Sequence, residues 1–378
     1  MTIAAVPLTE SLATLLKGQE VPWSAIHVTP AELLEACAEQ DLTGLVHQRV
    51  NDLRPGSDWP KGLREDLAGR ARGEAARELL RRREIASVLD ALDSRGVRPV
   101  LLKGTPLAYT VYDVPGSRPR GDTDLLVRRE QVDTIRHVMS GLGYVPTPYC
   151  DGELLFCQFE LGKPDAFGVH HAFDFHWKIS TQSMFADLLT YEELAADAAP
   201  VPALGPHARA AGPQHALLLA CVHPVMHHRN VERLLWVYDI HLLASRLSDA
   251  DLDRFADVAV AKEVAAISAH GLGLARSRFG SRIPDRVIAR LAAHGTAEPS
   301  ATYLQPERRW HDELTSCVRG LPRWRDRFRL LREVVLPDPR YMLRAYGVAP
   351  QTPGAALLPA LYFHRVIRGI WKIFVGLK

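Results

Sequence analysis

The stretch LLKGTPLAYTVYDVPGSRPRGDTDLLV, residues 101–127, contains two acids inside an otherwise apolar run. Asp122 and Asp124 are two positions apart in DTDLLV, whose leucines and valine indicate a buried strand. Side chains two positions apart on a strand lie on the same face. Two carboxylates on one half-buried face repel each other and lose hydration, so they need a counter-charge. The pair therefore predicts a bound metal ion.

The residues around this acid pair predict a small sheet. Apolar runs at residues 97–104 and 122–127 are expected to form two buried strands. Between these strands, Thr105 is expected to cap a short helix over residues 106–112, which opens with a proline. A further helix and two strands are expected at residues 129–144, 153–161 and 169–179. This order of elements predicts an α+β fold, in which a small mixed sheet carries its helices on one side.

A third acid lies in the last of these strands, VHHAFDFHWKI at residues 169–179. Strand alternation places Asp174 and His176 on one face, while Phe173 and Phe175 lie on the other. We expect the polar face to be exposed and to bring Asp174 close to the acid pair. Three carboxylates at one edge of a sheet form a hard, oxygen-rich site of the kind that Mg²⁺ prefers.

The remainder of the chain is expected to be helical, which divides it into three parts. Residues 1–95 form an N-terminal helical region, residues 96–200 contain the sheet, and residues 201–378 form a C-terminal helical region. In the N-terminal region, Thr29 followed by a proline predicts the start of a helix.

The C-terminal region is expected to be less regular. The helical segment from residue 212 is expected to be interrupted near Pro224. Residues 281–354 are expected to be looser because they are rich in arginine and proline, and the segment from residue 357 is amphipathic.

Composition indicates an ordinary globular protein in a reducing compartment. The chain has 378 residues and a formal net charge of +2, so no global field favours long nucleic acid as a partner. The N-terminal twenty residues lack the features of a signal peptide, and no apolar run approaches the ~20 residues of a transmembrane helix. We therefore expect a cytoplasmic location. The cysteines are odd in number, scattered, and without a CxxC pair: Cys37, Cys150, Cys157, Cys221 and Cys317.

Upstream of the acids, the sequence offers groups that bind phosphate. Gly104 lies at a strand-to-helix turn, where a phosphate can approach backbone N–H groups. Lys103, Arg118 and Arg120 could neutralise a triphosphate. Together with metal ions on the acids, these groups suit an in-line phosphoryl displacement.

In this order, the glycine turn, helix, acid pair and later acid resemble the DNA polymerase β-like nucleotidyltransferase superfamily. The form LLKGTPLAYTVY…RPRGDTDLLVRRE…GLGY…FDFHW is similar to a branch of uncharacterised nucleotidyltransferases that carry an LKG motif. The resemblance extends to the N-terminal helices, to LLWVYDIHLLA, and to LPDPRYMLRAYG…YFHRVIRG, and so covers nearly the whole chain. It implies a nucleotidyltransferase sheet embedded between N-terminal and C-terminal helical regions.

The resemblance assigns roles by position. Asp122 and Asp124 match the metal-binding pair, and Asp174 matches the third carboxylate. Gly104 matches the glycine of the nucleotide loop, and Lys103 matches the lysine of the LKG motif. Arg120 matches the arginine that precedes the acids. The usual Gly-Ser turn is replaced by Gly104-Thr105, and a longer loop precedes the first acid. These assignments imply Mg²⁺, with Mn²⁺ as an alternative, and an NTP as co-substrate. The acceptor stays open between a small molecule, a peptide and a protein, and an accessory role in natural-product pathways is implied by resemblance only.

Two other interpretations remain open. The protein could keep this fold as a catalytically silent nucleotide-binding or regulatory protein. Alternatively, a zinc-dependent hydrolase could use His176, His223, His227 and Asp239 as ligands. The HExxH pattern is absent, since residue 224 is a proline. These four residues are also candidates for the acceptor side of a transferase, where a histidine would help to deprotonate the nucleophile.

Overall fold

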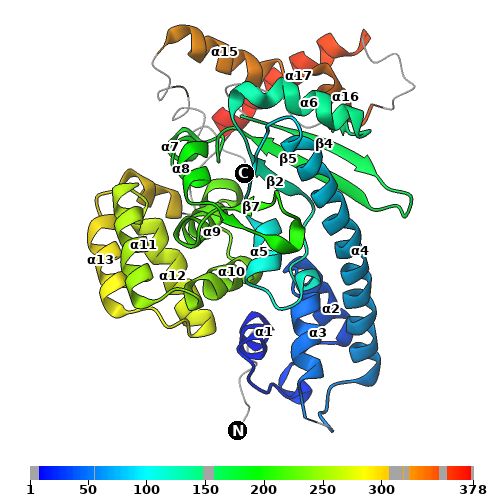
Figure 1. Ribbon diagram of the computed structural model, residues 1–378, viewed down its shortest axis with the longest axis vertical. Coiled ribbons are helices and arrows are strands. Elements are labelled where there is room, and N and C mark those ends of the chain that lie inside the picture. The colour runs from blue at the N-terminus through cyan, green and yellow to red at the C-terminus, as the bar shows by residue number, and fades with distance from the viewer. Residues whose placement is uncertain are drawn as a thin grey trace.

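The computed structural model describes residues 8–54, 56–147, 157–305, 318, 323–348 and 356–375. Its N-terminal part is helical, as the sequence predicts. The long helix α4 runs along one side of the molecule, and α9–α13 gather on the opposite side (Figure 1). The N-terminal helices are α1 (Leu8–Leu16), α2 (Pro30–Glu39), α3 (Thr43–Asn51) and α4 (Lys61–Asp93), with a 3₁₀ turn at Trp23–Ala25.

Helix α2 begins where the sequence predicts. The Thr29 hydroxyl accepts a hydrogen bond from the backbone N–H of Glu32, and the Glu32 carboxylate accepts one from the backbone N–H of Thr29. Each residue thereby satisfies a backbone donor that the helix end leaves unpaired.

The predicted α+β class is confirmed by a seven-stranded mixed sheet in the order β3-β4-β5-β2-β1-β7-β6. Strands β2 and β5 run parallel, whereas β4 and β5 form an antiparallel hairpin. The expected strand over residues 97–104 is only two residues long. The strands are β1 (Val100–Leu101), β2 (Thr123–Leu126), β3 (Val145–Pro146), β4 (Gln158–Pro164), β5 (His170–His176), β6 (Ala199–Pro200) and β7 (Arg209–Ala210).

Helices cover both faces of this sheet, so the prediction of helices on one side is wrong. On one face, Leu125, Phe173 and Phe175 belong to a buried cluster with residues of α4 and of α6 (Val132–Gly141). On the other face, Val100 and Leu126 belong to a larger cluster that includes residues of α5 (Gly104–Thr110) and of the C-terminal helices. The expected exposure of Asp174 is wrong for the same reason, because its face is covered and the residue is only 7% exposed.

The short helix after β1 begins earlier than the sequence predicts. Helix α5 starts at Gly104, and its N-cap is Lys103 rather than Thr105. Lys103 has φ 55° and ψ −132°, a conformation that residues other than glycine adopt rarely. The cap was therefore not readable from residue type, because Thr105 is a far more common cap than a lysine.

The C-terminal part is built from helices, including in the stretch expected to be irregular. Helix α9 continues through Pro224, so the break predicted there is wrong, and the chain turns instead at Arg229 and Asn230, where φ is 51° and 55°. The helices are α7 (Ser183–Ala186), α8 (Tyr191–Ala196), α9 (Pro213–His228), α10 (Leu234–Ser245), α11 (Asp249–Ala261), α12 (Ala265–Phe279), α13 (Asp285–Gly295), α15 (Trp324–Val335), α16 (Pro339–Ala345) and α17 (Leu358–Val375). Further 3₁₀ turns lie at Pro115–Ser117, Arg129–Gln131, Pro202–Leu204 and Pro299–Leu304.

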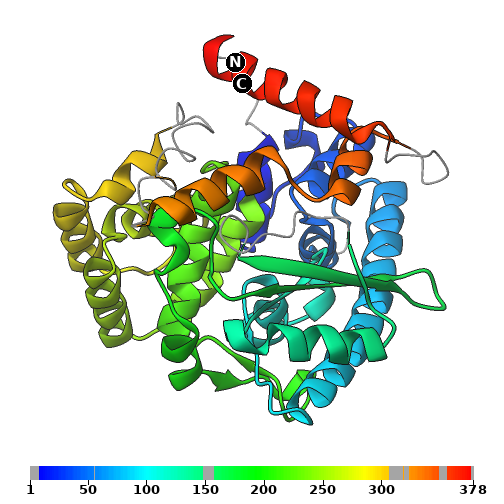
Figure 2. The ribbon, with the colours of Figure 1, turned by 90° about the horizontal axis from the view of Figure 1, so that it is seen from above.

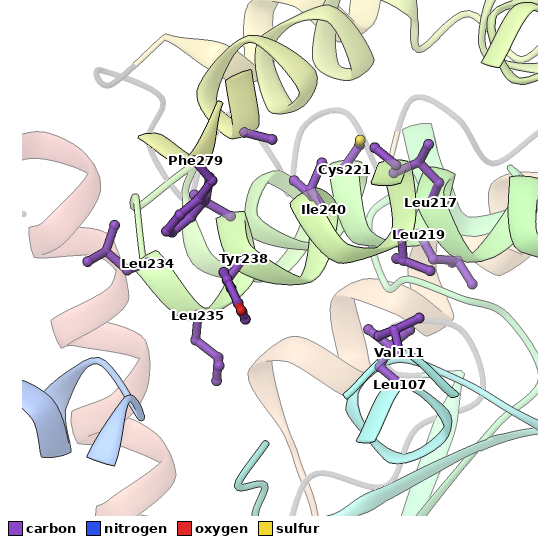
Figure 3. Close-up of a cluster of buried hydrophobic side chains, with 14 of the residues drawn as sticks. Leu107, Val111, Leu217, Leu219, Cys221, Leu234, Leu235, Tyr238, Ile240 and Phe279 are labelled. Atoms are coloured by element: carbon purple, nitrogen blue, oxygen red, sulfur yellow. The ribbon is translucent and has the colours of Figure 1, made fainter. Parts of the chain in front are cut away.

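One hydrophobic cluster joins the N-terminal helices, α5 and the C-terminal helices. In Figure 3, Leu107 of α5 and Val111, just after this helix, lie near Leu219 of α9 within this cluster. The sheet also extends through β7 beyond residue 200. The division of the chain at residues 95 and 200 stays a prediction.

The last helices of the chain, α15–α17, lie on the outside of the molecule. Figure 2 shows α17 on the outside, beyond α15 and α16. In the described part of the chain, no helix combines the length and apolar character that spanning a bilayer requires. The described cysteines Cys37, Cys157 and Cys221 are buried, while Cys150 and Cys317 lie outside the described residues.

Candidate metal and nucleotide site

Parallel pairing of two strands brings two of the predicted acids together. In the register of β2 and β5, Asp124 lies opposite Asp174, and His176 follows two positions later on the same face. All three side chains are buried. Each offers a ligand atom, and these atoms lie within 4.8 Å of one another. Asp122 lies just before β2, exposed and outside this compact group.

Asp124, Asp174 and His176 form a polar network in which one oxygen of Asp174 is bare, that is, without a hydrogen-bond partner among the described residues. The Lys103 ammonium lies 2.6 Å from Asp124 Oδ1, and His176 Nε2 lies 2.9 Å from the same oxygen and 3.2 Å from Asp174 Oδ2. Gln158 donates a hydrogen bond to Asp174 Oδ2 at 3.0 Å. Asp174 Oδ1 is buried without a hydrogen-bond partner among the described residues. A buried bare carboxylate oxygen beside a second carboxylate fits a hard divalent cation such as Mg²⁺ or Mn²⁺.

The charges in this network shift the pKa values of the acids in opposite directions. The negative charge of Asp124 raises the pKa of Asp122. Burial works against ionisation of Asp124, but Lys103 and His176 outweigh it and hold the pKa of Asp124 well below its usual range. Burial likewise disfavours protonated His176, yet the two carboxylates raise its pKa to about 9. The chain thus surrounds the acids with positive charge.

The turn before α5 stores backbone strain. A positive φ at a residue other than glycine costs about 1–3 kcal/mol and is typical of functional sites. At Lys103 this conformation places the ammonium on Asp124. Next to it, Thr105 Oγ1 is buried without a hydrogen-bond partner in the described part of the chain. The turn therefore presents an ammonium group to the acids and carries a buried hydroxyl one residue beyond Gly104.

A comparison with known protein families matches residues 27–280 to the uncharacterised nucleotidyltransferases. The match covers about two thirds of the chain and includes every site residue described above. The chain belongs to this family. A search of curated proteins finds no match.

In this nucleotidyltransferase, Arg118 lies in a buried ion pair rather than beside the acids. Its guanidinium donates to both carboxylate oxygens of Asp239 in α10 at 2.8–3.1 Å. Tyr112 donates a further hydrogen bond to Asp239 Oδ1 at 2.7 Å. A Cβ added at Gly104 would lie 3.0 Å from Arg118 Nη1, so the glycine makes room for the guanidinium. Arg118 and Asp239 therefore connect the loop before β2 to the C-terminal helices.

The second arginine of the loop, Arg120, lies against α4. Its Nη2 donates to Glu78 Oε1 at 2.8 Å, and its guanidinium carbon lies 5.9 Å from the centre of the Tyr109 ring. Tyr109 also donates a hydrogen bond to Glu78. Nε and Nη1 of Arg120 are buried and have no hydrogen-bond partner in the described residues. Arg120 thus anchors the loop to α4 while it keeps two donors free.

The histidines of α9 form a cluster of aromatic rings with Trp236. The centres of the His223 and His228 rings are 4.9 Å apart, and His228 lies over Trp236 at 4.2 Å. Burial lowers the pKa of His227 to about 3 and that of His223 well below its usual range, so both rings are neutral. Within the described residues, the group of His, Cys, Asp or Glu ligands close enough for an ion is Asp124, Asp174 and His176.

This arrangement does not assemble the zinc site that the sequence left open. Asp239 is engaged by Arg118 and Tyr112, whereas His176 lies between the two acids. Of the four residues of that interpretation, only His176 belongs to the group that could hold an ion.

Sequence reasoning missed two polar residues that support the site. Gln158 lies opposite His176 in the β4–β5 hairpin and donates to Asp174. Glu78 holds Arg120 from α4. The hairpin register would have placed Gln158 beside the acids, but it depends on a turn whose length the sequence does not specify. No sequence signal marks Glu78, since it is one of many charges in α4.

Proposed function

We propose that this nucleotidyltransferase transfers a nucleoside monophosphate from an NTP to an acceptor, with Asp122, Asp124 and Asp174 holding Mg²⁺ or Mn²⁺. The observation that carries the proposal is the β2–β5 register, which places Asp124 opposite Asp174 with a bare oxygen beside it. Metal ions bound there supply positive charge that offsets the phosphate charge during in-line displacement.

The nucleotide side of the site is assigned to the turn before α5. Lys103 is the cation nearest the acids, and Thr105 carries a free buried hydroxyl. These two groups, with the backbone at Gly104, would seat the triphosphate. Arg118 and Arg120 would act mainly by holding the loop that carries the acids, since each is bound to a buried carboxylate.

The acceptor side requires a group that takes a proton. The acceptor oxygen forms a bond to the α-phosphorus while the bond to pyrophosphate breaks, and the hydroxyl proton passes to a base. His223 is the candidate base, because burial lowers its pKa and keeps the ring neutral, and its buried Nδ1 has no hydrogen-bond partner among the described residues. His176 and Gln158 hold Oδ2 of Asp174 and so orient its other oxygen, Oδ1, as a metal ligand.

Isothermal titration of the wild type with each NTP, with and without Mg²⁺, tests this proposal. We expect metal-dependent binding that is lost in Asp124→Asn and Asp174→Asn. Asp253→Asn is the matched control, because Asp253 is an exposed acid paired with Arg286 on another part of the molecule. Metal-independent binding that survives both substitutions would instead favour a silent nucleotide-binding protein, and no binding at all would refute the donor half of the reaction.

A further inference from the structure

A cavity of about 340 Å³ opens beside the turn that carries Lys103 and Gly104. Its walls come from α5, from one face of α9, from α10 and from the short strands β6 and β7. On α9, the lining residues recur at helical spacing from Pro213 to His223, and Ala216 and Ala220 among them leave space for a ligand. The cavity therefore follows the length of a helix.

The packing of α9 against α10 gives this cavity two distinct ends. At one end, His228 of α9 contacts Trp236 at the start of α10. At the other, Gln214 near the start of α9 donates to Asp251 in the first turn of α11 at 3.0 Å. Pro213 and His223 are ten residues apart on one helix, so the channel between the ends is about 15 Å long.

One end of the channel lies at the candidate site. Lys103 lines it and lies 2.6 Å from Asp124. His223 lines the same end, is neutral, and has a buried Nδ1 without a hydrogen-bond partner among the described residues. These two side chains leave hydrogen-bonding capacity for a ligand at this end.

Along the rest of the channel, the charged side chains Arg118, Asp239 and Arg246 already make hydrogen bonds within the protein. Arg118 and Asp239 bind each other in the wall. Arg246, at the far end, donates to the backbone carbonyl of Val111 at 3.0 Å. Apolar side chains fill the intervening wall, among them Leu107 of α5 and the following Val111, which lie near Leu219 in Figure 3. Such a wall suits an apolar chain better than the hydrogen-bonding edge of a nucleobase.

We propose that this channel binds the acceptor, and that the acceptor is an elongated amphipathic alcohol. Its alkyl chain lies between α5 and the α9–α10 pair, and its terminal hydroxyl lies at the Lys103 and His223 end. This inference rests on the proposed nucleotidyl transfer. The terminal oxygen bonds to the α-phosphorus, pyrophosphate leaves, and the hydroxyl proton passes to His223 Nδ1.

Binding of 1-decanol to the full chain, measured by isothermal titration beside 1-butanol, tests the channel. We expect saturable binding of 1-decanol and much weaker binding of 1-butanol, since each additional buried methylene adds affinity. Ala220→Trp should fill the channel and weaken 1-decanol binding about tenfold or more. Ala292→Trp, on the exposed surface of α13, is the matched control and should bind like the wild type.

Titration of the same variants with NTP and Mg²⁺ separates the two proposals. Ala220→Trp should retain metal-dependent NTP binding, which also reports that it is folded, and Ala216→Leu is a smaller filling variant if it is not. A wild type that binds NTP with Mg²⁺ but not 1-decanol would overturn the channel proposal alone. Equal 1-decanol binding by the wild type and the folded filling variants would overturn it as well. Loss of NTP binding in the wild type would instead refute the proposed function.

Discussion

Two buried carboxylates in this nucleotidyltransferase, Asp239 and Asp174, have opposite hydrogen-bonding states. Both oxygens of Asp239 are bound, by the guanidinium of Arg118 and by the Tyr112 hydroxyl. Asp174 has one oxygen bound by His176 and Gln158, and the other is bare within the described structure. The two residues are almost equally buried, at 3% and 7% exposed.

This difference separates a structural role from a functional one. A buried carboxylate with every oxygen paired stabilises the contact between two parts of the chain, and removing one partner leaves an uncompensated charge. A buried carboxylate with a bare oxygen is costly in the folded protein unless it has a ligand to bind. We therefore expect substitutions at Asp239 to affect stability and substitutions at Asp174 to affect binding.

The largest expected effect is that of Asp239→Ala. It leaves the Arg118 charge buried and unpaired, which should lower the free energy of unfolding by about 3–5 kcal/mol. Urea denaturation followed by circular dichroism measures the loss. Asp253→Ala, which removes one partner of an exposed ion pair, should have a much smaller effect. Similar losses in the two variants would mean that the buried pair does not join the loop to α10.

Tyr112→Phe, which alters the same Asp239 ion pair, should lower the stability less than Asp239→Ala does. It removes one hydrogen bond to a charged group and should lower the free energy of unfolding by about 1.5–3 kcal/mol. The same denaturation experiment measures it, and Mg²⁺-dependent NTP binding serves as the second readout. Because Tyr112 lies away from the acids, that binding should persist, and its loss would show that the two regions are not independent.

Divalent metal should stabilise the wild type through Asp174 and its neighbours. At a free Mg²⁺ concentration tenfold above its dissociation constant, the free energy of unfolding should rise by about 1.4 kcal/mol. EDTA should reverse the increase, and Asp174→Asn should show none. An equal increase in wild type and Asp174→Asn would locate the metal elsewhere.

Asp174→Asn itself should have the smallest effect on stability without added metal. The amide keeps the shape of the side chain, and the substitution removes a carboxylate that has one unpaired oxygen. We expect the free energy of unfolding to change by at most about 1 kcal/mol. A loss as large as that of Asp239→Ala would show that Asp174 has mainly a structural role.

The sequence predicted the order of the elements and the neighbourhood of the acids better than it predicted their partners. Period-two alternation placed Asp174 and His176 on one face, and strand order placed them beside Asp124. Arg118 and Asp239 are separated by 120 intervening residues, so no local pattern indicated that they bind each other. The burial of Asp174 was missed because it depends on how the C-terminal helices pack, which lies outside the strand pattern.

The N-cap of α5 illustrates a different limit. Residue preferences favour Thr105, yet the chain uses Lys103 in a strained conformation. Local preferences describe unstrained backbone, and departures from them are typical of functional turns. The continuation of α9 through Pro224 is a similar case, in which packing of the helix overrides the preference of one residue.

The most direct test of the proposed metal site is a count of bound Mn²⁺ by electron paramagnetic resonance, with a non-hydrolysable NTP analogue present. The comparison is between the wild type, Asp174→Asn and the surface control Asp253→Asn. We expect the wild type and Asp253→Asn to bind Mn²⁺ alike, and Asp174→Asn to lose this binding while it stays folded. Undiminished Mn²⁺ binding by folded Asp174→Asn would contradict the claim that the bare carboxylate oxygen in β5 is a metal ligand.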